Sequence, residues 1–346
     1  MNKTNHSEKV LVAMSGGVDS SVTATLLKRA GFDVAGAFMK LWRPGDNFKQ
    51  DKNEEKAKEI ADSLDIPFYS FNFGEEFKAE VVDYFLKEYR QGRTPNPCVV
   101  CNNEIKFGLF LKQASDLNVD FIATGHYARL KRNNKVNIYR PKDKSKDQTY
   151  FLWQLDQNKL DKVLFPLGNF EREEVERMAD SLNLPDRAQE SHEVCFIPNE
   201  IKDFLNKHLD EKPGKIISED GEELGEHEGA YLFTLGQRKG LGLSNGPWYV
   251  LEKNVKENKI VVTKERENLK KKELIADEIN WISGKPDLPM KVITKIRYNS
   301  SGVKAELKEQ DNKLKVTFNE SQWAIAPGQS VVFYSGDQLL GGGVIQ

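Results

Sequence analysis

The sequence predicts an α/β protein, with a doubly wound parallel sheet at the N-terminus followed by a small central domain and a C-terminal β-barrel. Over residues 10–124, apolar runs of strand length alternate with amphipathic runs of helix length. Such strand–helix–strand repeats build parallel sheets that helices cover on both faces. From about residue 214 the pattern changes to short β runs separated by glycine turns, which is typical of small barrels and sandwiches. We expect the three domains to span residues 1–200, 201–272 and 273–346.

Hydrophobic periodicity and glycine stops define the elements of the N-terminal domain. The first strand is apolar throughout, and the helix that begins at Ser20 ends before Gly31. A second helix places Ile60, Ala61 and Leu64 on one face. Ligands of such sheets bind at the carboxyl ends of the strands. We expect strands over residues 10–14, 34–42, 68–73 and 121–124, and helices over residues 20–30, 53–64, 77–90 and 104–115.

After the fourth strand the chain changes character. Residues 128–140 predict a hairpin with Asn133 and Asn134 at its turn, and residues 171–182 return to helix. The run Lys270-Lys271-Lys272 is interpreted as a solvated linker. Strands are expected over residues 215–217, 249–251, 260–263, 290–298, 304–307, 313–318 and 330–334, and the tryptophans expected in the core of the β domains are Trp248, Trp281 and Trp323.

Composition limits the class of protein. The chain has 346 residues, of which 30% are charged and 38% hydrophobic, and a net charge of −2. It contains no apolar run near the roughly 18 residues of a membrane-spanning helix and no signal-peptide-like start. Three cysteines are too few for a disulfide framework and indicate a reducing compartment. We therefore expect a cytoplasmic globular protein without a membrane partner, whose RNA affinity would come from local basic patches.

A glycine turn between the first strand and the first helix is the most informative feature. In the run 15–20, Gly16 and Gly17 let backbone N–H groups approach phosphate oxygens at a helix N-terminus. Asp19 offers a carboxylate for Mg²⁺, and the lysine of a Walker loop is missing. The alternative is an ordinary glycine-rich turn. The preceding strand and the Asp-Ser pair favour a nucleotide site, and the run resembles the SGGxDS loop of the ATP-pyrophosphatase superfamily.

The three cysteines form the second candidate site. A proline-rich loop carries Cys98 and Cys101, and we expect Cys101 to open a helix whose N-terminus lowers the pKa of its thiol. The third is Cys195. A structural zinc site, with His126 or His192 recruited, and a thioredoxin-like dithiol are two alternatives. Sulfur handling, in which one cysteine carries a persulfide and another attacks it, is favoured beside an ATP-activating loop.

A set of motifs along the chain carries a family resemblance, at residues 15–20, 92–102, 104–107, 123–127, 146–151, 195–197, 234–241, 327–329 and 341–343. From about residue 9 to the C-terminus, the chain resembles the bacterial tRNA-specific 2-thiouridylase family. The resemblance implies ATP-dependent thiolation of the wobble uridine (position 34) of tRNAs for Lys, Glu and Gln, with an adenine nucleotide alpha hydrolase-like first domain and a tRNA-contacting central domain.

The resemblance also implies a role for each site residue. Cys195 would carry the persulfide, and Cys101 would attack it or close a disulfide with it. The expected partners are tRNA and a cysteine desulfurase or sulfur-relay protein as sulfur donor, and a monomer is favoured. The expected ATP contacts are Ala13, Met14, Ser15, Gly16, Gly17, Val18, Asp19, Ser20, Met39 and Gly125. The expected contacts to the target base and the tRNA are Asn96, Pro97, Cys98, Lys146, Asp147, Gln148, Arg297 and Tyr298.

The chain departs from the family pattern at two positions. Cys98 stands where many members have Asp, and His192 stands where Gln is common. Three thiolates at Cys98, Cys101 and Cys195 would suit a [4Fe–4S] cluster, so sulfide carried on a cluster is an alternative to the persulfide. Two further alternatives assign the chain a different function. One is another adenylating synthetase, such as an amide-forming ligase, and the other is a catalytically silent tRNA-binding protein.

Basic residues gather beside the predicted site. Residues 129–146 hold eight Lys and Arg against one acid, Asp143, and a phosphate-tracking role for this run is favoured over a merely solvated hairpin. Replacing Lys131 and Arg132 by Glu is then expected to weaken tRNA binding. A glycine-framed loop adds Arg238 and Lys239. These two patches are the candidate RNA contacts outside the site itself.

Overall fold

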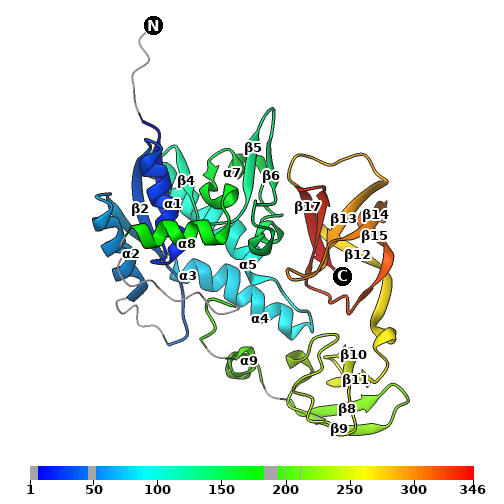
Figure 1. Cartoon of the computed structure of the whole chain (residues 1–346). Helices are drawn as coiled ribbons and strands as arrows, with labels where there is room; N and C mark the ends of the chain where they lie inside the picture. Colours follow the sequence, from blue (N-terminus) through cyan, green and yellow to red (C-terminus); the bar gives the residue numbers. More distant parts are fainter. Residues whose placement is uncertain (1–6, 46–51, 183–193, 199, 211) are drawn as a thin grey trace. The chain divides into compact units, whose positions relative to one another are not determined.

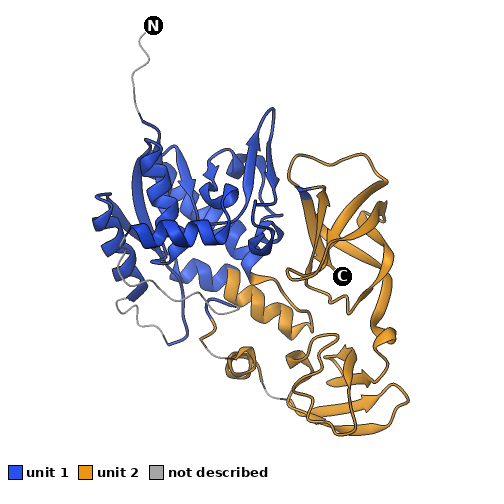
Figure 2. Ribbon diagram, viewed as in Figure 1, with its two compact units in different colours: residues 1–80, 98–196, 337–340 blue, residues 81–97, 197–336, 341–346 orange. Residues whose placement is uncertain are grey.

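The computed structural model describes residues 7–45, 52–182, 194–198, 200–210 and 212–346. The chain forms two compact units, shown in Figure 2. The first consists of residues 1–80, 98–196 and 337–340, and the second of residues 81–97, 197–336 and 341–346. Each unit is therefore built from segments that lie far apart in the sequence.

The first unit contains the predicted parallel sheet, in the strand order β3-β2-β1-β4-β7 (Figure 1). Every neighbouring pair is parallel. The chain runs from the central strand β1 outward to β3 and then returns to the other side of β1, which confirms the doubly wound prediction. Such a reversal leaves a ligand crevice at the carboxyl ends of the two central strands, β1 and β4. The strands are β1 (Lys9–Ala13), β2 (Asp33–Lys40), β3 (Phe68–Asn72), β4 (Phe121–Ala123) and β7 (Val163–Leu164).

Helices pack against this sheet through the predicted apolar faces. Val10 and Val12 of β1 share a buried cluster with Leu27 of α1 and with Ile60 and Ala61 of α2. A second cluster joins α1 to α8 through buried Val22, Val175 and Ala179. The helices of this unit are α1 (Val18–Arg29), α2 (Lys52–Ser63), α3 (Gly74–Phe77), α6 (Phe110–Asp116), α7 (Gln157–Leu160) and α8 (Arg172–Ser181).

Two expected helices contain π-helical segments. The helix expected over 77–90 consists of α3, a π-helical segment Lys78–Val82 and α4 (Asp83–Arg90). The helix expected over 104–115 begins earlier, with α5 (Pro97–Val100) and the π-helical segment Cys101–Leu109. A π-helix bonds residue i to i+5 and is frequent at functional sites. Periodicity alone does not distinguish this winding from an α-helix.

The predicted hairpin is present as β5 (Arg129–Arg132) and β6 (Val136–Tyr139). Its register pairs Arg132 with Val136, so the turn lies where the two asparagines were expected. Within the first unit, β6 also pairs with Gln338 and Leu339 of β17 (Gln338–Ile345).

The second unit contains a small sheet and a barrel. The small sheet has the order β10-β11-β8-β9 and buries Ile216, Val250 and Ile260. Strands β12, β15, β14, β13, β16 and β17 are consecutive neighbours, and β12 also pairs with β17, which closes the predicted barrel. The bounds are α9 (Ile201–His208), β8 (Gly214–Ser218), β9 (Glu223–His227), β10 (Tyr249–Asn254), β11 (Lys259–Thr263), β12 (Lys270–Trp281), β13 (Met290–Lys295), β14 (Val303–Gln310), β15 (Lys313–Trp323) and β16 (Ser330–Ser335).

The linker prediction for the lysine run is wrong. Lys270, Lys271 and Lys272 begin β12, where Lys270 pairs with Trp323 and Lys271 with Gln322. The three lysine side chains are exposed while the backbone bonds to β15. A strand needs only its backbone groups for the ladder, so charged side chains that point into water do not prevent it.

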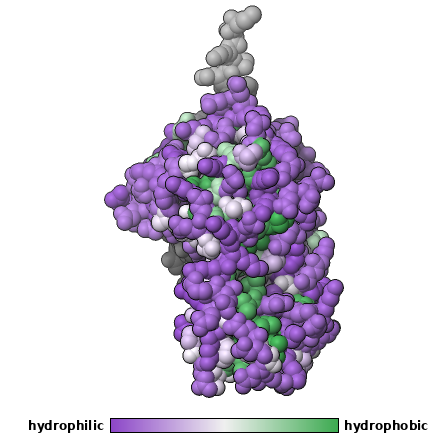
Figure 3. All heavy atoms as spheres, turned by 90° about the vertical axis from the view of Figure 1, so that its right-hand side faces the viewer, coloured by the Kyte–Doolittle hydropathy of each residue, from purple (hydrophilic) through white to green (hydrophobic). Residues whose placement is uncertain are grey.

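The surface agrees with the charged composition. The face drawn in Figure 3 is mostly hydrophilic, and hydrophobic residues gather there only in small patches. Among the described residues, no helix combines the length and the apolar character that a membrane crossing requires.

Candidate nucleotide site and cysteine cluster

The glycine turn is held in shape by its own polar groups. It connects β1 to α1, and Gly16 has a φ of +77°, where a Cβ would lie 2.9 Å from the carbonyl oxygen of Asn53. The backbone N–H of Ser15 donates to Ser20 Oγ over 3.2 Å, and Ser20 Oγ donates to the carbonyl of Gly17 over 3.0 Å. The turn is thus preorganised at the N-terminus of α1, where the helix dipole favours anions.

The other predicted nucleotide residues lie at the same edge of the sheet. Gly125 follows β4 and lies against the start of α1, since a Cβ there would be 2.9 Å from Asp19 Cβ. Met39 is the next-to-last residue of β2, and Met14 N donates to the carbonyl of Ala37 on that strand. The glycine turn, Met39 and Gly125 therefore lie at the ends of three neighbouring strands, β1, β2 and β4.

Asp19 has two partners that the sequence did not indicate. Its Oδ1 accepts a hydrogen bond from the hydroxyl of Tyr127 over 3.0 Å and one from Arg172 Nη1 over 2.7 Å. Burial, and then the charge of Asp19, raise the pKa of Tyr127. Arg172 is the first residue of α8, whose start is fixed by a capping box between Glu171 and Glu174. No motif distinguishes Arg172, because its partner is 153 residues away in the chain.

The same tyrosine and arginine hold the segment with the expected tRNA contacts Lys146, Asp147 and Gln148. The backbone N–H of Tyr127 donates to Gln148 Oε1 over 2.9 Å, and that of Gln148 to the carbonyl of Tyr127 over 3.2 Å. The backbone N–H of Arg172 donates to Asp143 Oδ2 over 3.0 Å. Asp147 is buried and accepts from the backbone N–H and the hydroxyl of Thr149, so its carboxylate fastens the turn. The segment and the glycine turn thus share two anchors.

The three cysteines lie in the same unit, and none is in a disulfide. Cys101 is buried, Cys98 is half-buried, and Cys195 is exposed. The charge of an ionised Cys195 would raise the pKa of both other thiols, so the three sulfurs are near enough to interact electrostatically. Phe196 packs its ring 5.7 Å from that of Phe77, which anchors the residue next to Cys195.

The expected lowering of the Cys101 pKa is wrong. Burial raises the pKa of Cys101 to about 12 and that of Cys98 to about 11. Protein atoms packed around Cys195 also raise the pKa of its thiol, although the residue as a whole is exposed. Cys101 does not open a helix, because α5 precedes it, and it lacks the solvation that a thiolate needs.

Lys106 is the charged group that acts on all three thiols. Its ammonium opposes the effect of burial by lowering the pKa of Cys98, Cys101 and Cys195. Lys106 follows Cys101 by five residues, the hydrogen-bonding interval of the π-helix that carries both. Lys106 belongs to the motif over residues 104–107, but the sequence indicates no role for it, because only the tertiary structure brings the cysteines near it.

Comparison with known proteins shows the family of this chain. Family models match the tRNA methyl transferase HUP domain over residues 8–199, the tRNA methyl transferase PRC-barrel domain over 202–264 and the aminomethyltransferase beta-barrel domain over 271–345. The tRNA-specific 2-thiouridylase MnmA of Lactobacillus johnsonii is 43% identical over 359 residues, which cover 99% of this chain and 96% of that protein. The proteins of the same name from Streptococcus agalactiae and Geobacillus thermodenitrificans are each 43% identical over 357 residues, covering 99% and 100% of this chain and 96% of each relative. The chain belongs to the tRNA-specific 2-thiouridylase family. The resemblance read from the sequence is therefore confirmed.

The cysteines of this 2-thiouridylase family member do not form a metal site in this structure. Among the residues that the structure describes, no group of three or more His, Cys, Asp and Glu side chains could hold a metal ion. The [4Fe–4S] cluster and the zinc site stay predictions of the sequence. His192 lies outside the described residues. His126 is buried between the rings of Phe107 and Phe165, and burial followed by the charge of Lys106 holds its pKa well below the usual range.

The expected base and tRNA contacts in the second unit have structural partners of their own. Asn96 Nδ2 donates to Ser330 Oγ over 3.1 Å. Arg297 donates to the carbonyl of Ala324 and lies 5.5 Å over the ring of Trp323. Tyr298 is half-buried, and Lys295 Nζ lies 5.8 Å from its ring centroid.

The basic hairpin of the first unit is more structural than the sequence suggested. Arg132 donates to the carbonyls of Leu160 and Val163, over 3.2 and 2.6 Å. Arg129 donates to the carbonyl of Arg140 over 2.7 Å. Lys131 is exposed and lies over the ring of Tyr139 at 4.5 Å. Lys131 and Arg132 are both exposed, and Arg132 in addition fixes the hairpin to the carbonyls of Leu160 and Val163.

Proposed function

We propose that this chain uses ATP to 2-thiolate the wobble uridine of tRNAs for Lys, Glu and Gln, with sulfur carried as a persulfide on Cys195. One observation carries the proposal. A glycine turn lies where the strand order of the sheet reverses, and the same unit holds three thiols that interact with one another and with Lys106. A nucleotide site and reactive sulfur are the two requirements for exchanging a carbonyl oxygen for sulfur.

In the first step the uridine O2 attacks the α-phosphorus of ATP, the bond to the bridging oxygen breaks, and pyrophosphate leaves. The N–H groups of the turn and the N-terminus of α1 bind the phosphates. Gly125 leaves room beside Asp19, where a Cβ would collide. Mg²⁺ needs only one or two protein carboxylates besides phosphates, so Asp19 would hold it beside Arg172. The ion would offset phosphate charge.

In the second step the terminal sulfur of the Cys195 persulfide attacks C2, and the C–O bond breaks with the oxygen leaving on AMP. Cys101 then loses its proton and attacks Cys195 Sγ, the S–S bond breaks, and its electron pair goes to the sulfur on C2, which becomes the thiocarbonyl as N3 of the base takes up the proton that it lost on adenylation. The Cys101–Cys195 disulfide left behind is reduced by an external thiol. Lys106 favours the anionic sulfur forms, because it lowers the pKa of both thiols. A cysteine desulfurase or sulfur-relay protein supplies the persulfide.

The target base would lie against Asn96, Pro97 and Cys98, flipped out of its stack. At this position Cys98 replaces the carboxylate that many family members have. Burial raises its pKa to about 11, so Cys98 is a neutral thiol near pH 7 and serves as a contact rather than as a general base.

Mass spectrometry of tRNA nucleosides tests the proposal. Unmodified tRNA is incubated with the protein, ATP, Mg²⁺ and a persulfide donor, and we expect 2-thiouridine from the native chain. Cys195→Ser should form none while it still binds ATP, and Cys101→Ser should stall with sulfur bound. Thiolation by Cys195→Ser would contradict the sulfur route. A native chain that consumes ATP with ammonia, and makes no thiouridine, would instead favour the amide-forming alternative.

A further inference from the structure

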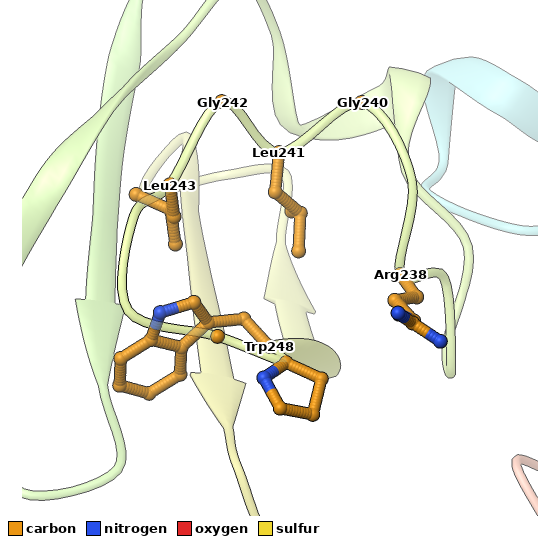
Figure 4. Close-up of a pocket in the computed structure, with 8 residues that line it drawn as sticks. Arg238, Gly240, Leu241, Gly242, Leu243 and Trp248 are labelled. Atoms are coloured by element: carbon orange, nitrogen blue, oxygen red, sulfur yellow. The ribbon is translucent and has the colours of Figure 1, made fainter.

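A pocket of about 410 Å³ opens in the part of the second unit that carries the small sheet (Figure 4). Its wall is formed by a glycine-rich loop, residues 238–248, which precedes β10. The backbone has positive φ at Gly240, Gly242 and Asn245, so the loop turns sharply and leaves a hollow. The lining residues are Arg238, Gly240, Leu241, Gly242, Leu243, Gly246, Pro247 and Trp248.

The floor of the pocket is apolar and fixed. Leu241 is buried in the core of the small sheet, and Leu243 and Trp248 pack against that core while remaining partly exposed. Trp248 Nε1 donates to the carbonyl of Ser244 over 2.9 Å, which sets the plane of the indole. Trp248, expected in the core of the β domains, packs against that core and also lines the pocket.

Positive charge surrounds the aromatic ring. Arg238 lines the pocket and is exposed, as is its neighbour Lys239. Lys264 Nζ lies 4.7 Å from the centroid of the Trp248 ring. No lining residue is acidic. A partly exposed aromatic ring with cations beside it matches an unpaired nucleotide, because a base can stack on the ring in place of Lys264 and phosphates pair with the cations.

We propose that this pocket binds an unpaired nucleotide of the tRNA, other than the uridine that is thiolated, with the base against Trp248 and a phosphate at Arg238. The proposal rests on the proposed function, because it assumes tRNA as the substrate. An apolar side chain of a sulfur-donor protein is the competing occupant. The local charge favours RNA, since residues 236–248 contain two cations and no carboxylate.

The test measures the affinity of unmodified tRNA by fluorescence anisotropy over a series of salt concentrations. Stacking of one base contributes about 1–3 kcal/mol, so Trp248→Ala should weaken binding about 5- to 100-fold, whereas Trp248→Phe should retain most of the affinity. Arg238→Ala should reduce the slope of log Kd against log salt concentration by about one, the contribution of one phosphate contact. Lys256→Ala is the matched control, because Lys256 is an exposed lysine in the turn between β10 and β11, outside the pocket.

Thermal unfolding checks that each variant is folded. If Trp248→Ala does not fold, the affinity and salt slope of Arg238→Ala test the proposal. Native affinity and an unchanged salt slope in folded variants would overturn the proposal. So would variants that bind tRNA normally and thiolate it with a small-molecule persulfide, but lose activity with a protein sulfur donor, since that result assigns the pocket to the sulfur-donor protein. A native chain that neither binds nor thiolates tRNA would instead refute the proposed function.

Discussion

Arg172 should control how tightly the glycine turn binds ATP. Its guanidinium donates to Asp19 Oδ1 over 2.7 Å and, through Nε, to Glu176 over 2.7 Å. Arg172→Gln would leave the Asp19 carboxylate uncompensated at the point where the phosphates of ATP are proposed to bind. We therefore expect the substitution to weaken ATP binding although Arg172 lies outside the turn.

The size of the effect follows from the geometry. Two like unit charges on the order of 5 Å apart repel by roughly 3 kcal/mol at an effective dielectric constant of about 20. The Asp19 side chain is 35% exposed, so solvent screens much of this repulsion. A remainder of about 1–2 kcal/mol corresponds to ATP affinity about 5- to 30-fold weaker.

Calorimetric titration with ATP, in the presence and absence of Mg²⁺, measures the effect. Arg177→Gln is the control, because it removes the same charge from an exposed position on the same helix. If repulsion from Asp19 is the cause, adding Asp19→Asn to Arg172→Gln should restore affinity in Mg²⁺-free buffer. Native affinity in folded Arg172→Gln, or a double variant no better than the single one, would refute the reasoning.

Three further predictions concern the other parts of the first unit. Gly125→Ala should abolish measurable ATP binding in a folded protein, because the new Cβ would lie 2.9 Å from Asp19 Cβ and 3.0 Å from the Asp19 carbonyl carbon. Native affinity measured by calorimetry would contradict this prediction. Lys106→Met removes the cation that lowers the pKa of Cys195, so alkylation of Cys195 by iodoacetamide should slow at pH 8. The curve of alkylation rate against pH should move to higher pH, whereas Lys112→Met, at an exposed position, should leave that curve in place. Arg132→Ala should lower stability by about 1–3 kcal/mol, measured by denaturant unfolding, because the carbonyls of Leu160 and Val163 lose their donor; a loss as small as that of Lys131→Ala would show that these bonds contribute little.

Local signals in the sequence were enough for the framework of the fold. The apolar run at β1, the glycine turn and the amphipathic pattern of α2 each depend on neighbours within a few residues. The order of strands and helices then implied a parallel sheet with its ligand edge at the turn. The lysine run at the start of β12 was misread for the converse reason, because its pairing with β15 lies outside any local window.

The chemistry of the site needed the tertiary structure. The glycine turn, the three cysteines and the similarity of the whole chain to 2-thiouridylases could be read directly, because residue types and spacing carry them. The pairing of Asp19 with Arg172, the position of Lys106 among the thiols and the raised pKa of Cys101 could not. Each depends on burial and on distances between segments far apart in the chain, and those are set only when the core packs.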